Sequence, residues 1–493
     1  MKDLLILAPL LGAAGTGILV MALDLLTGRS DRRKAFLAWV TALGLCLCAV
    51  GAMALWQDAP ALAAPFFKDV VIPDRFTAFF GALALFGAAA SALLAVDFVP
   101  AHAIEPGPFY ALFAFCGAGA LTFVAAGDVL TMFLGLEIMS LAAYALAASA
   151  KDSPFGMEAG LKYFVLGSIA AALLLFGFAF LYGETGGLAI HALVKGGGQY
   201  RLVALVLLIT ALGFKVAMVP FHFWTPDVYQ GAPTPVSGLM ASTIKAAGFA
   251  VLARLLLSLF HDQASLPVMR EMLLGLSVLT MVVGNILGIV QDDVKRILAY
   301  SSIAHAGYLL LGVYAGRHGA QALLNEAVPF YLVVYVAGTI GAFGVISLVG
   351  RRGDATVRLG DLSGLARTEP LLAVSLLISV LSLAGVPPFA GFMAKFALFK
   401  AILAADPDRN LVFVMVAVLN SLIALYYYLR VLVHAYFHDQ ADGTPLSSTT
   451  ARLIIVLAAA VSLYLGLFPG PTMSASSAAA NVAVMFGDAA FGP

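Results

Sequence analysis

The chain has 493 residues, of which 62% are hydrophobic and 11% are charged. A soluble globular protein carries about 25% charged residues, so the composition excludes a water-soluble fold and indicates an integral membrane protein. The formal net charge is zero, which gives no support for nucleic-acid binding.

Hydropathy predicts ~14 apolar segments that are long enough to cross a bilayer as helices. In chain order they cover residues 4–26, 35–56, 76–97, 108–126, 128–150, 160–182, 201–224, 236–260, 272–290, 297–315, 328–349, 371–403, 411–437 and 452–470. The first run is longer than the apolar core of a signal peptide, so we expect it to be a transmembrane helix. No segment alternates as the strands of a membrane barrel do. We expect an all-α polytopic protein with a single integral membrane domain over residues 1–493.

Lysine and arginine are distributed unequally between the two sides of the membrane. One side carries Arg29, Arg32, Arg33, Lys34, Lys151, Lys162, Lys295, Arg296, Arg351, Arg352, Arg358, Arg367 and Arg452. The other side carries Lys2, Lys68, Arg75, Lys195, Arg201, Arg270, Arg317 and Arg409. The positive-inside rule therefore predicts that the first side is cytoplasmic and that both termini lie on the non-cytoplasmic side.

Two related proline motifs lie inside the seventh and twelfth spans. Val219–Trp224 reads VPFHFW, and Val386–Phe392 reads VPPFAGF. Proline interrupts a helix, so both spans are predicted to be discontinuous. Because the motifs are five spans apart, a duplicated five-helix unit must insert upside down. We expect two inverted five-helix repeats, at 108–260 and 272–437, followed by a final helix at 452–470, an arrangement typical of transporters.

Five ionisable residues lie well inside predicted spans, namely Glu137, Lys215, Lys245, His305 and Lys395. A charge at the centre of a bilayer costs roughly 2.5–3.5 kcal/mol even on insertion scales, so residues of this kind are usually functional.

Polar neighbours accompany two of the five residues. Ser140 and Tyr144 share a helical face with Glu137, and this face must point into the bundle or at water. A similar polar face surrounds His305 and contains Ser301, Ser302 and Tyr308. The alternatives are a structural carboxylate that pairs with a lysine for packing and a histidine that is only hydrogen-bonded in the core.

Other polar residues in the spans have simpler explanations. Arg254, Lys400 and Arg430 lie nearer the ends of their spans, where their side chains are expected to reach the interface by snorkelling. Tyr331 and Tyr335 fall on one face of the eleventh span, but tyrosines of this kind are also common in interfacial belts.

Buried lysines suit proton transfer because desolvation lowers the pKa of an amine from ~10.4 and a nearby carboxylate raises it again. A pair of Glu137 and Lys215 therefore works as a switch, in which the lysine keeps its proton while the pair is closed. We expect Lys245 and Lys395 to be further stations on the same axis, linked through His305.

Several kinds of site are absent from the sequence. The three cysteines form no CxxC pair, which argues against a zinc or iron–sulfur site. We find no dinucleotide fingerprint, P-loop, nucleophile elbow or HExxH motif. If the protein belongs to a redox system, the electrons move elsewhere.

Three segments resemble the antiporter-like proton-pumping subunits of respiratory complex I, most closely the subunit N family, equivalent to mitochondrial subunit 2. They are Phe214–Ala250, with its PDVYQGAPTPV and KAAGFA motifs, Val294–Tyr308 and Leu383–Phe396. The resemblance covers nearly the whole chain. It implies that the protein is a membrane subunit of a proton-translocating NADH-quinone oxidoreductase.

The resemblance also implies roles for individual residues. Glu137 matches the glutamate of the fifth span, Lys215 the lysine of the broken seventh span, and Lys245 the central lysine of the eighth span. Lys395 matches the terminal lysine of the twelfth span, where sister subunit M has a glutamate. His305 lies where the polar axis of the family runs.

The family also implies the surroundings of the chain. NADH, FMN, iron–sulfur clusters and quinone are expected in partner subunits, with no cofactor and no metal bound by this chain. The expected partners are other membrane subunits of the complex, in a bacterial cell membrane. The alternatives are a subunit of a cation/proton antiporter complex or membrane-bound hydrogenase, and a purely structural scaffold, which the buried titratable axis argues against.

Overall fold

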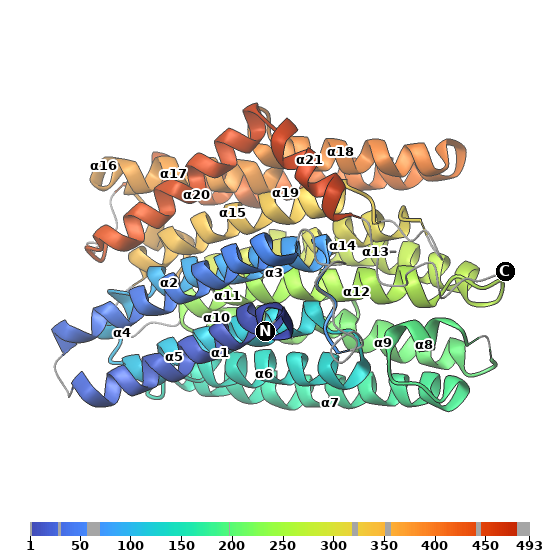
Figure 1. Ribbon diagram of the computed structural model, residues 1–493. Coiled ribbons are helices and arrows are strands. Elements are labelled where there is room, and N and C mark those ends of the chain that lie inside the picture. The colour runs from blue at the N-terminus through green and yellow to red at the C-terminus, as the bar shows by residue number, and fades with distance from the viewer. Residues whose placement is uncertain are drawn as a thin grey trace.

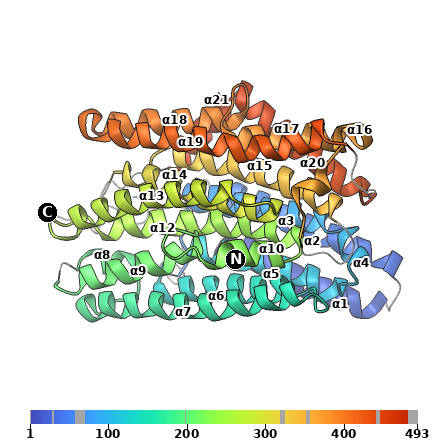
Figure 2. The ribbon, with the colours of Figure 1, turned by 180° about the vertical axis from the view of Figure 1, so that it is seen from behind.

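The computed structural model of the chain describes residues 2–27, 31–56, 70–196, 198–317, 324–350, 356–439 and 445–480. These residues are almost entirely helical, and three isolated β-bridges join pairs of them. Most of the helices run side by side along one direction (Figure 1 and Figure 2). The expected all-α polytopic class is confirmed.

The structure contains 21 α-helices, one π-helical turn and one 3-10 turn in its described part. In chain order they are α1 Lys2–Thr27, α2 Asp31–Trp56, α3 Arg75–Leu94, α4 Phe98–Ala101, α5 Pro106–Ala125, α6 Val129–Ala147, α7 Pro154–Thr185, α8 Ile190–Val194, α9 Arg201–Lys215, α10 Trp224–Gly231, α11 Thr234–Leu239, the π-helical turn Met240–Ile244, α12 Lys245–Leu259, α13 Ser265–Ile289, α14 Val294–Tyr314, α15 Ala327–Val349, the 3-10 turn Leu359–Leu362, α16 Leu365–Thr368, α17 Pro370–Ala384, α18 Ala390–Ala405, α19 Pro407–Phe437, α20 Thr449–Leu467 and α21 Gly470–Ala479.

Twelve helical segments within the described ranges are long and apolar enough to cross a membrane. They correspond to twelve of the predicted spans. The other two predicted spans, the seventh and the twelfth, are divided between α9 and α10 and between α17 and α18. The predicted discontinuities are therefore confirmed.

The first break follows Lys215, the last residue of α9. A broken span leaves amide and carbonyl groups that lipid cannot satisfy. Here the indole N–H of Trp224 donates to the carbonyl of Phe214 at 3.0 Å, and the amide of Val219 donates to the hydroxyl of Thr280 at 3.1 Å. The protein itself thus supplies the hydrogen-bond partners that the break requires.

The second break follows Ala384, the last residue of α17, and is tightly packed around glycines. Gly385 adopts a left-handed conformation with φ 84°, which favours glycine. The amide of Gly391 donates to the hydroxyl of Ser382 at 3.2 Å. A Cβ atom on Gly391 would lie 1.6 Å from the carbonyl oxygen of Ser382, so only glycine fits this approach.

The two halves of the bundle repeat the same local pattern. Asp128 caps the start of α6 and forms a β-bridge with Ala189, which follows α7. Asp293 caps the start of α14 and forms a β-bridge with Arg358, which follows α15. In both halves the same helix pairs pack together: α5 with α6 and α7 with α9, then α13 with α14 and α15 with α17. From α7 to α14 the chain crosses the bundle five times. Because five is an odd number, α14 runs in the opposite direction to α6 and the second copy is inverted.

The centre of the bundle is formed by α11, α12 and α14 (Figure 1). The spans Thr234–Leu259 and Val294–Tyr314 are wholly buried, whereas only 33–39% of the spans on α1, α7, α19 and α20 is buried. The helices that carry Lys245 and His305 therefore lie farthest from lipid.

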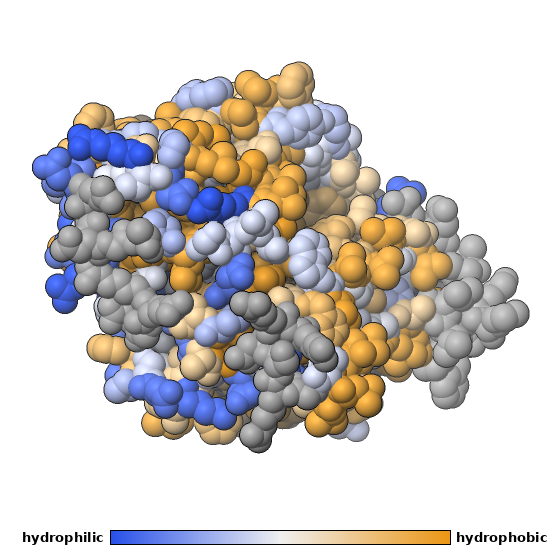
Figure 3. Space-filling model, turned by 90° about the vertical axis from the view of Figure 1, so that its left-hand side faces the viewer, coloured by the Kyte–Doolittle hydropathy of each residue, from blue (hydrophilic) through white to orange (hydrophobic). Residues whose placement is uncertain are grey.

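Hydrophilic side chains gather at the end of the bundle that carries α4 and α16, and hydrophobic ones continue along its flank (Figure 3). Exposed residues in the loops at this end include Lys151 and Arg367. Three cations that the sequence assigned to loops are instead buried, Lys295 at 1%, Arg201 at 2% and Lys34 at 9% exposure. Of the other loop cations, Arg29, Lys68, Arg351 and Arg352 lie outside the described residues.

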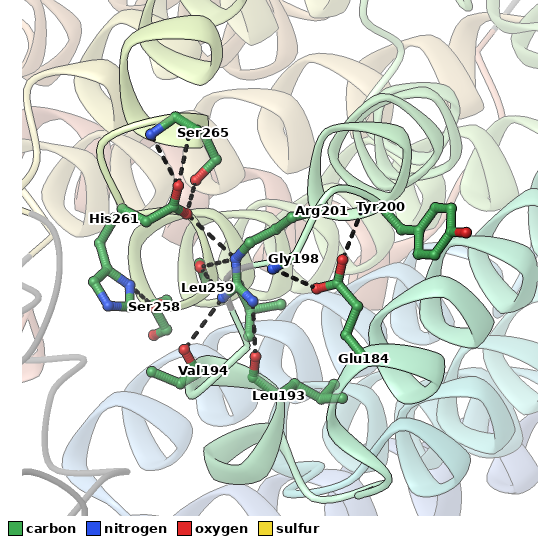
Figure 4. A network of polar contacts seen from close by, with 12 residues as sticks. Glu184, Leu193, Val194, Gly198, Tyr200, Arg201, Ser258, Leu259, His261 and Ser265 are labelled. Atoms are coloured by element: carbon green, nitrogen blue, oxygen red, sulfur yellow. Dashed lines mark hydrogen bonds and ion pairs between the residues drawn. The ribbon is translucent and has the colours of Figure 1, made fainter.

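Arg201 joins the outer ends of three helices of the first half (Figure 4). Its guanidinium donates to the carbonyls of Leu193 at 3.1 Å and Val194 at 3.3 Å, at the end of α8. It also donates to the carbonyl of Leu259 at 3.2 Å, at the end of α12, and lies 3.4 Å from Asp262. A cation is favourable at these helix C-termini because their free carbonyls carry partial negative charge.

Asp262 completes this network in the loop between α12 and α13. Burial alone raises the pKa of this carboxyl, but hydrogen bonds from Ser265 and Ala264 and the nearby Arg201 outweigh it and hold the pKa of Asp262 below its usual range. A group whose pKa is lowered on folding adds stability above its unfolded pKa of about 3.9, and that stability is lost as the pH falls through the folded value.

The three cations near the ends of spans differ in their surroundings. Lys400 is exposed, and Arg430 is partly exposed and pairs with Asp292 at 2.6 Å. Arg254 is fully buried, so the expectation that it reaches the interface is wrong. The reason is that a carboxylate 180 positions away in the chain satisfies it inside the bundle.

That carboxylate is Asp74, the N-cap residue of α3. Arg254 donates to its two oxygens at 2.8 and 2.6 Å, and to the hydroxyl of Thr77 at 2.9 Å and the carbonyl of Val124 at 3.0 Å. The guanidinium carbon also lies 4.2 Å from the ring centroid of Phe76. The ion pair therefore fixes α12 against α3.

Removing one partner of this buried pair leaves the other charge uncompensated. We expect Asp74→Leu and Arg254→Met each to lower the free energy of unfolding by about 3–5 kcal/mol. The double variant should recover most of this loss, because it leaves no buried charge. Thermal unfolding of the detergent-solubilised protein measures the effect, and a double variant as unstable as the single ones contradicts the argument.

Gly391→Ala should disrupt the second break, because the added methyl overlaps the carbonyl of Ser382. We expect a loss of about 1–3 kcal/mol or more, as for an overpacked core. Gly360→Ala is the matched control, since a Cβ there meets nothing within 4 Å. The measurement is the unfolding temperature and the yield of inserted protein, and equal values for the two variants would refute the steric explanation.

Candidate functional site

The five ionisable residues singled out in the sequence lie on five different spans. They are Glu137 on α6, Lys215 on α9, Lys245 on α12, His305 on α14 and Lys395 on α18. The three lysines and the histidine are at most 5% exposed. Glu137 is half-buried, and its Oε1 atom is buried without a hydrogen-bond partner.

Lys215 is held by one hydroxyl and two aromatic rings. Its Nζ donates to Ser140 Oγ at 2.7 Å, and Ser140 in turn donates to the carbonyl of Leu136 at 2.5 Å. The ammonium lies 5.8 Å from the ring centroid of Tyr144 and 5.5 Å from that of Tyr163. These rings supply cation–π attraction, which is stronger in a desolvated site.

Glu137 and Lys215, which the sequence suggested as a pair that opens and closes, do not touch one another. No ion pair joins them in the described part of the chain, although their charges interact electrostatically. The lysine instead donates to Ser140, one turn after Glu137.

A small cavity lies beside Lys215 between α6, α7 and α9. Its lining includes the small residues Gly167, Ala170, Ala171 and Ala211 together with Ser140, Tyr144 and Lys215. Gly167 makes the approach of Tyr144 possible, because a Cβ there would lie 1.9 Å from the tyrosine hydroxyl. The side chain of Lys215 thus has space on one side that a close-packed core lacks.

Lys245 directly follows the π-helical turn Met240–Ile244, an irregularity that is frequent at functional sites. Its Nζ donates to both the carbonyl and the hydroxyl of Ser302. The hydroxyl of Tyr335 donates to the Ser302 hydroxyl at 2.8 Å, and the Tyr335 ring centroid lies 5.6 Å from the ammonium of Lys245. No carboxylate balances this lysine among the described contacts.

His305 has a hydroxyl at each ring nitrogen. Nδ1 lies 2.7 Å from the hydroxyl of Tyr331, and Nε2 lies 3.3 Å from that of Tyr428, which also contacts Ser301. A neutral imidazole donates at one nitrogen and accepts at the other. An exchange of tautomers therefore reverses the direction of both hydrogen bonds.

Lys395 occupies the second helix break. Its Nζ donates at 2.8 Å to the carbonyl of Ala384, which the end of α17 leaves free, and lies 5.0 Å from the ring centroid of Tyr308. A Cβ on Gly385 would lie 2.8 Å from the lysine Cδ. The glycine therefore makes room for the lysine at the negative end of the α17 dipole.

The structure groups the predicted residues in one continuous region. His305 lies within electrostatic reach of both Lys245 and Lys395. Gly248, one turn after Lys245, packs against Lys215, with a Cβ there 3.7 Å from the lysine Cγ. The five predicted residues are thus spread from α6 through the buried centre to α18.

Some residues of this region were not anticipated. Tyr428 belongs to a run of three tyrosines, Tyr426–Tyr428, well inside an apolar span, which was an available signal. Lys295 was assigned to a loop, but it is buried and donates to the carbonyl of Ala232 at 2.7 Å. The position of Lys295 at the start of a span does not indicate that the carbonyl of Ala232, far away in the chain, accepts its hydrogen bond.

Among the described residues, no group of three or more histidine, cysteine, aspartate or glutamate side chains could hold a metal ion. The polar groups that converge on the axis are ammonium, imidazole and hydroxyl groups. This set of groups is suited to donating and accepting protons.

The chain is similar to known membrane subunits over most of its length. The family model of the NADH:quinone oxidoreductase/Mrp antiporter transmembrane region matches residues 126–423. NADH-quinone oxidoreductase subunit N 1 of Sorangium cellulosum is 42% identical over 424 residues, which cover 81% of each chain.

Solved structures agree with this similarity. A chain of respiratory complex I from Thermus thermophilus superposes with a TM-score of 0.79 at 35% identity, covering 95% of this chain and 99% of that one. A chain of the Mrp complex from Dietzia sp. DQ12-45-1b has a TM-score of 0.82 at 24% identity, covering 99% and 98%, which shows a shared fold alone. The chain therefore belongs to the NADH:quinone oxidoreductase/Mrp antiporter transmembrane family, as a member of its NADH-quinone oxidoreductase subunit N branch.

Proposed function

We propose that this chain translocates protons as a membrane subunit of an NADH-quinone oxidoreductase, along an axis formed by Glu137, Lys215, Lys245, His305 and Lys395. The observation that carries the proposal is the burial of three lysines and a histidine in one region of a membrane bundle. Such groups are costly at this depth and are usually kept for function.

The first step of the mechanism is a switch between Glu137 and Lys215. When the carboxylate approaches the ammonium, the proton stays on the lysine, because an opposite charge favours the charged form. When Ser140 replaces the carboxylate, as in this structure, a neutral hydroxyl gives weaker stabilisation and the proton can leave. The cavity beside Lys215 provides the space for this change.

The later steps use groups that can both donate and accept. Ser302 links Lys245 to Tyr335, and His305 stands between Tyr331 and Tyr428. A tautomer exchange of His305 moves a proton from one tyrosine side to the other. Lys395 receives the proton at the second break. The two halves, residues 108–260 and 272–437, would then hold separate parts of one path.

Partner subunits are needed for the redox chemistry and to cover the exposed face of α6 that carries Glu137. NADH oxidation and quinone reduction need FMN, iron–sulfur clusters and quinone, which we place in partner subunits. On this chain, Glu137 is half-exposed on the same face of α6 as Leu134, Ile138 and Leu141, which are strongly exposed. Because lipid cannot satisfy a carboxylate, a neighbouring membrane subunit should cover this face and could carry the coupling signal.

We propose a bacterial inner membrane as the location, with both termini on the non-cytoplasmic side, because the loops at the opposite side are richer in lysine and arginine.

A role in a cation/proton antiporter or a membrane-bound hydrogenase remains the second candidate, since the Mrp chain shares the fold. Sodium, however, needs several oxygen ligands, whereas this axis presents mainly ammonium groups.

Replacing Lys215 with Ala should abolish proton pumping, because the switch loses its proton carrier. We expect a decrease of about 100-fold or more, in line with the contribution of a positioned proton-transfer group. NADH-driven acidification of proteoliposomes that contain the assembled complex measures the rate. Lys195→Ala, which alters an exposed loop lysine, is the control, and normal pumping by the inserted Lys215→Ala protein would sink the proposal.

Glu137→Gln keeps the shape of the side chain but removes its charge. If the coupling signal is electrostatic, this variant should lower pumping and quinone reductase activity together, because the two are linked through the same switch. Glu158→Gln, at an exposed carboxylate on α7, controls for the loss of one negative charge. Native rates of both activities in the Glu137→Gln complex would contradict electrostatic coupling.

A further inference from the structure

A second set of buried polar side chains lies where α13 packs against α19, outside the five proposed stations. Asn285 is 0% exposed, Tyr427 1% and Asn420 4%. An amide at this depth has no water or lipid partner, so it must be satisfied by protein. None of these three residues is used by the steps described above.

The hydrogen bonds of this set have a fixed direction. The amide nitrogen of Asn420 donates to the backbone carbonyl of Val416 at 2.9 Å, so its Oδ1 must face the other way. This oxygen accepts from Asn285 Nδ2 at 3.1 Å, which leaves Asn285 Oδ1 to accept from the hydroxyl of Tyr427 at 3.0 Å. Because a carbonyl can only accept, the order from Tyr427 to Asn285 to Asn420 is determined.

The tyrosine end of this chain leads to His305. The rings of Tyr427 and Tyr428 are 4.6 Å apart, and their hydroxyls interact. Tyr428 is the residue whose hydroxyl lies 3.3 Å from His305 Nε2. The hydroxyl of Tyr427 therefore contacts both Asn285 and Tyr428.

Asn285 also meets the environment of Lys395. The hydroxyl of Tyr308 interacts with both Asn285 and Ser421, and the Ser421 hydroxyl donates to it at 3.2 Å. The ring of the same tyrosine lies 5.0 Å from Lys395 Nζ. One amide therefore contacts Tyr308, which is next to Lys395, and Tyr427, which packs on the tyrosine next to His305.

The backbone of α13 supports this arrangement. Gly288 lies one turn after Asn285, and a Cβ there would be 3.2 Å from the Tyr427 ring. The ring thus rests on the helix backbone, which limits its movement. Close packing of this kind holds the hydroxyl in line with the Asn285 oxygen.

We infer that Asn285 is a positioning residue that joins the His305 and Lys395 stations through Tyr427, Tyr428 and Tyr308. The inference rests on the proposed proton axis and adds a link to it. Asn285 transfers no proton. It fixes the donor direction of Tyr427 on one side and orients Tyr308 on the other, so that the hydroxyls between the two stations form one connected set.

The test compares three variants of the assembled complex in proteoliposomes. Asn285→Leu removes the donor and the acceptor at similar volume. Asn285→Asp keeps the acceptor and, when protonated, the donor. Asn410→Leu is the matched control, because Asn410 is also fully buried, accepts from the hydroxyl of Tyr314 at 3.1 Å and donates to the carbonyl of Ile402 at 2.8 Å, away from the axis. The readout is the number of protons pumped per NADH oxidised.

We expect Asn285→Leu to lower this ratio roughly tenfold, the lower range for a lost orienting partner, and Asn285→Asp to restore most of it. Asn410→Leu should keep the native ratio even if less complex assembles. A purely structural asparagine predicts that Asn285→Leu lowers the amount of assembled complex but leaves the native ratio unchanged. Equal ratios for Asn285→Leu and Asn410→Leu would overturn the inference.

Tyr427→Phe provides a second test if Asn285→Leu does not assemble, because it removes only the hydroxyl that Asn285 orients. A low pumping ratio in this variant supports the link, and a native ratio overturns it. The proposed function is tested separately by Lys215→Ala. If that variant fails to pump while Tyr427→Phe and Asn285→Leu pump normally, the axis stands and only the Asn285 link is wrong.

Discussion

The lack of hydrogen-bond partners in a bilayer determines most of this structure. A charged group or a free backbone group inside the membrane has to be satisfied by the protein or by water held in it. Each buried lysine of the axis obeys this constraint. Lys215 donates to Ser140, Lys245 to Ser302 and Lys395 to the carbonyl of Ala384. None of these hydrogen bonds goes to a carboxylate, so each ammonium is held by neutral acceptors.

The two helix breaks meet the same constraint in different ways. At the first break, Trp224 and Thr280 satisfy the freed backbone, and Lys215 is left to bond elsewhere. At the second break, Lys395 itself satisfies the freed carbonyl. A neutral amine still has two N–H donors, so this carbonyl keeps a partner after deprotonation. Lys395 can therefore change its protonation state without loosening the break. Lys215 bonds to Ser140 and to no backbone group of its own break.

The sequence predicts the spans and the breaks well because both follow from local chemistry. A run of apolar residues has to be about the thickness of the bilayer, and a proline interrupts a helix wherever it lies. The ionisable residues of the axis are visible for the same reason, since few charges interrupt those runs. Partners that are distant in the chain are not visible. The periodicity of a helix gives the face of a side chain but not the neighbour, so Arg254 with Asp74 and Lys295 with Ala232 were missed.

The two halves of the path also differ in how firmly their polar groups are held. Around Lys215 there is one hydroxyl, two rings and a cavity lined by small residues. Around His305, Tyr331 of α15 and Tyr428 of α19 each bond to the histidine, and the ring of Tyr428 packs against that of Tyr427. A switch requires space, because its charges must separate and meet again. A relay requires fixed donors and acceptors, because proton transfer depends on their distance and alignment. The inverted repeat thus gives one helix arrangement two kinds of interior, a loose one around Lys215 and a closely bonded one around His305.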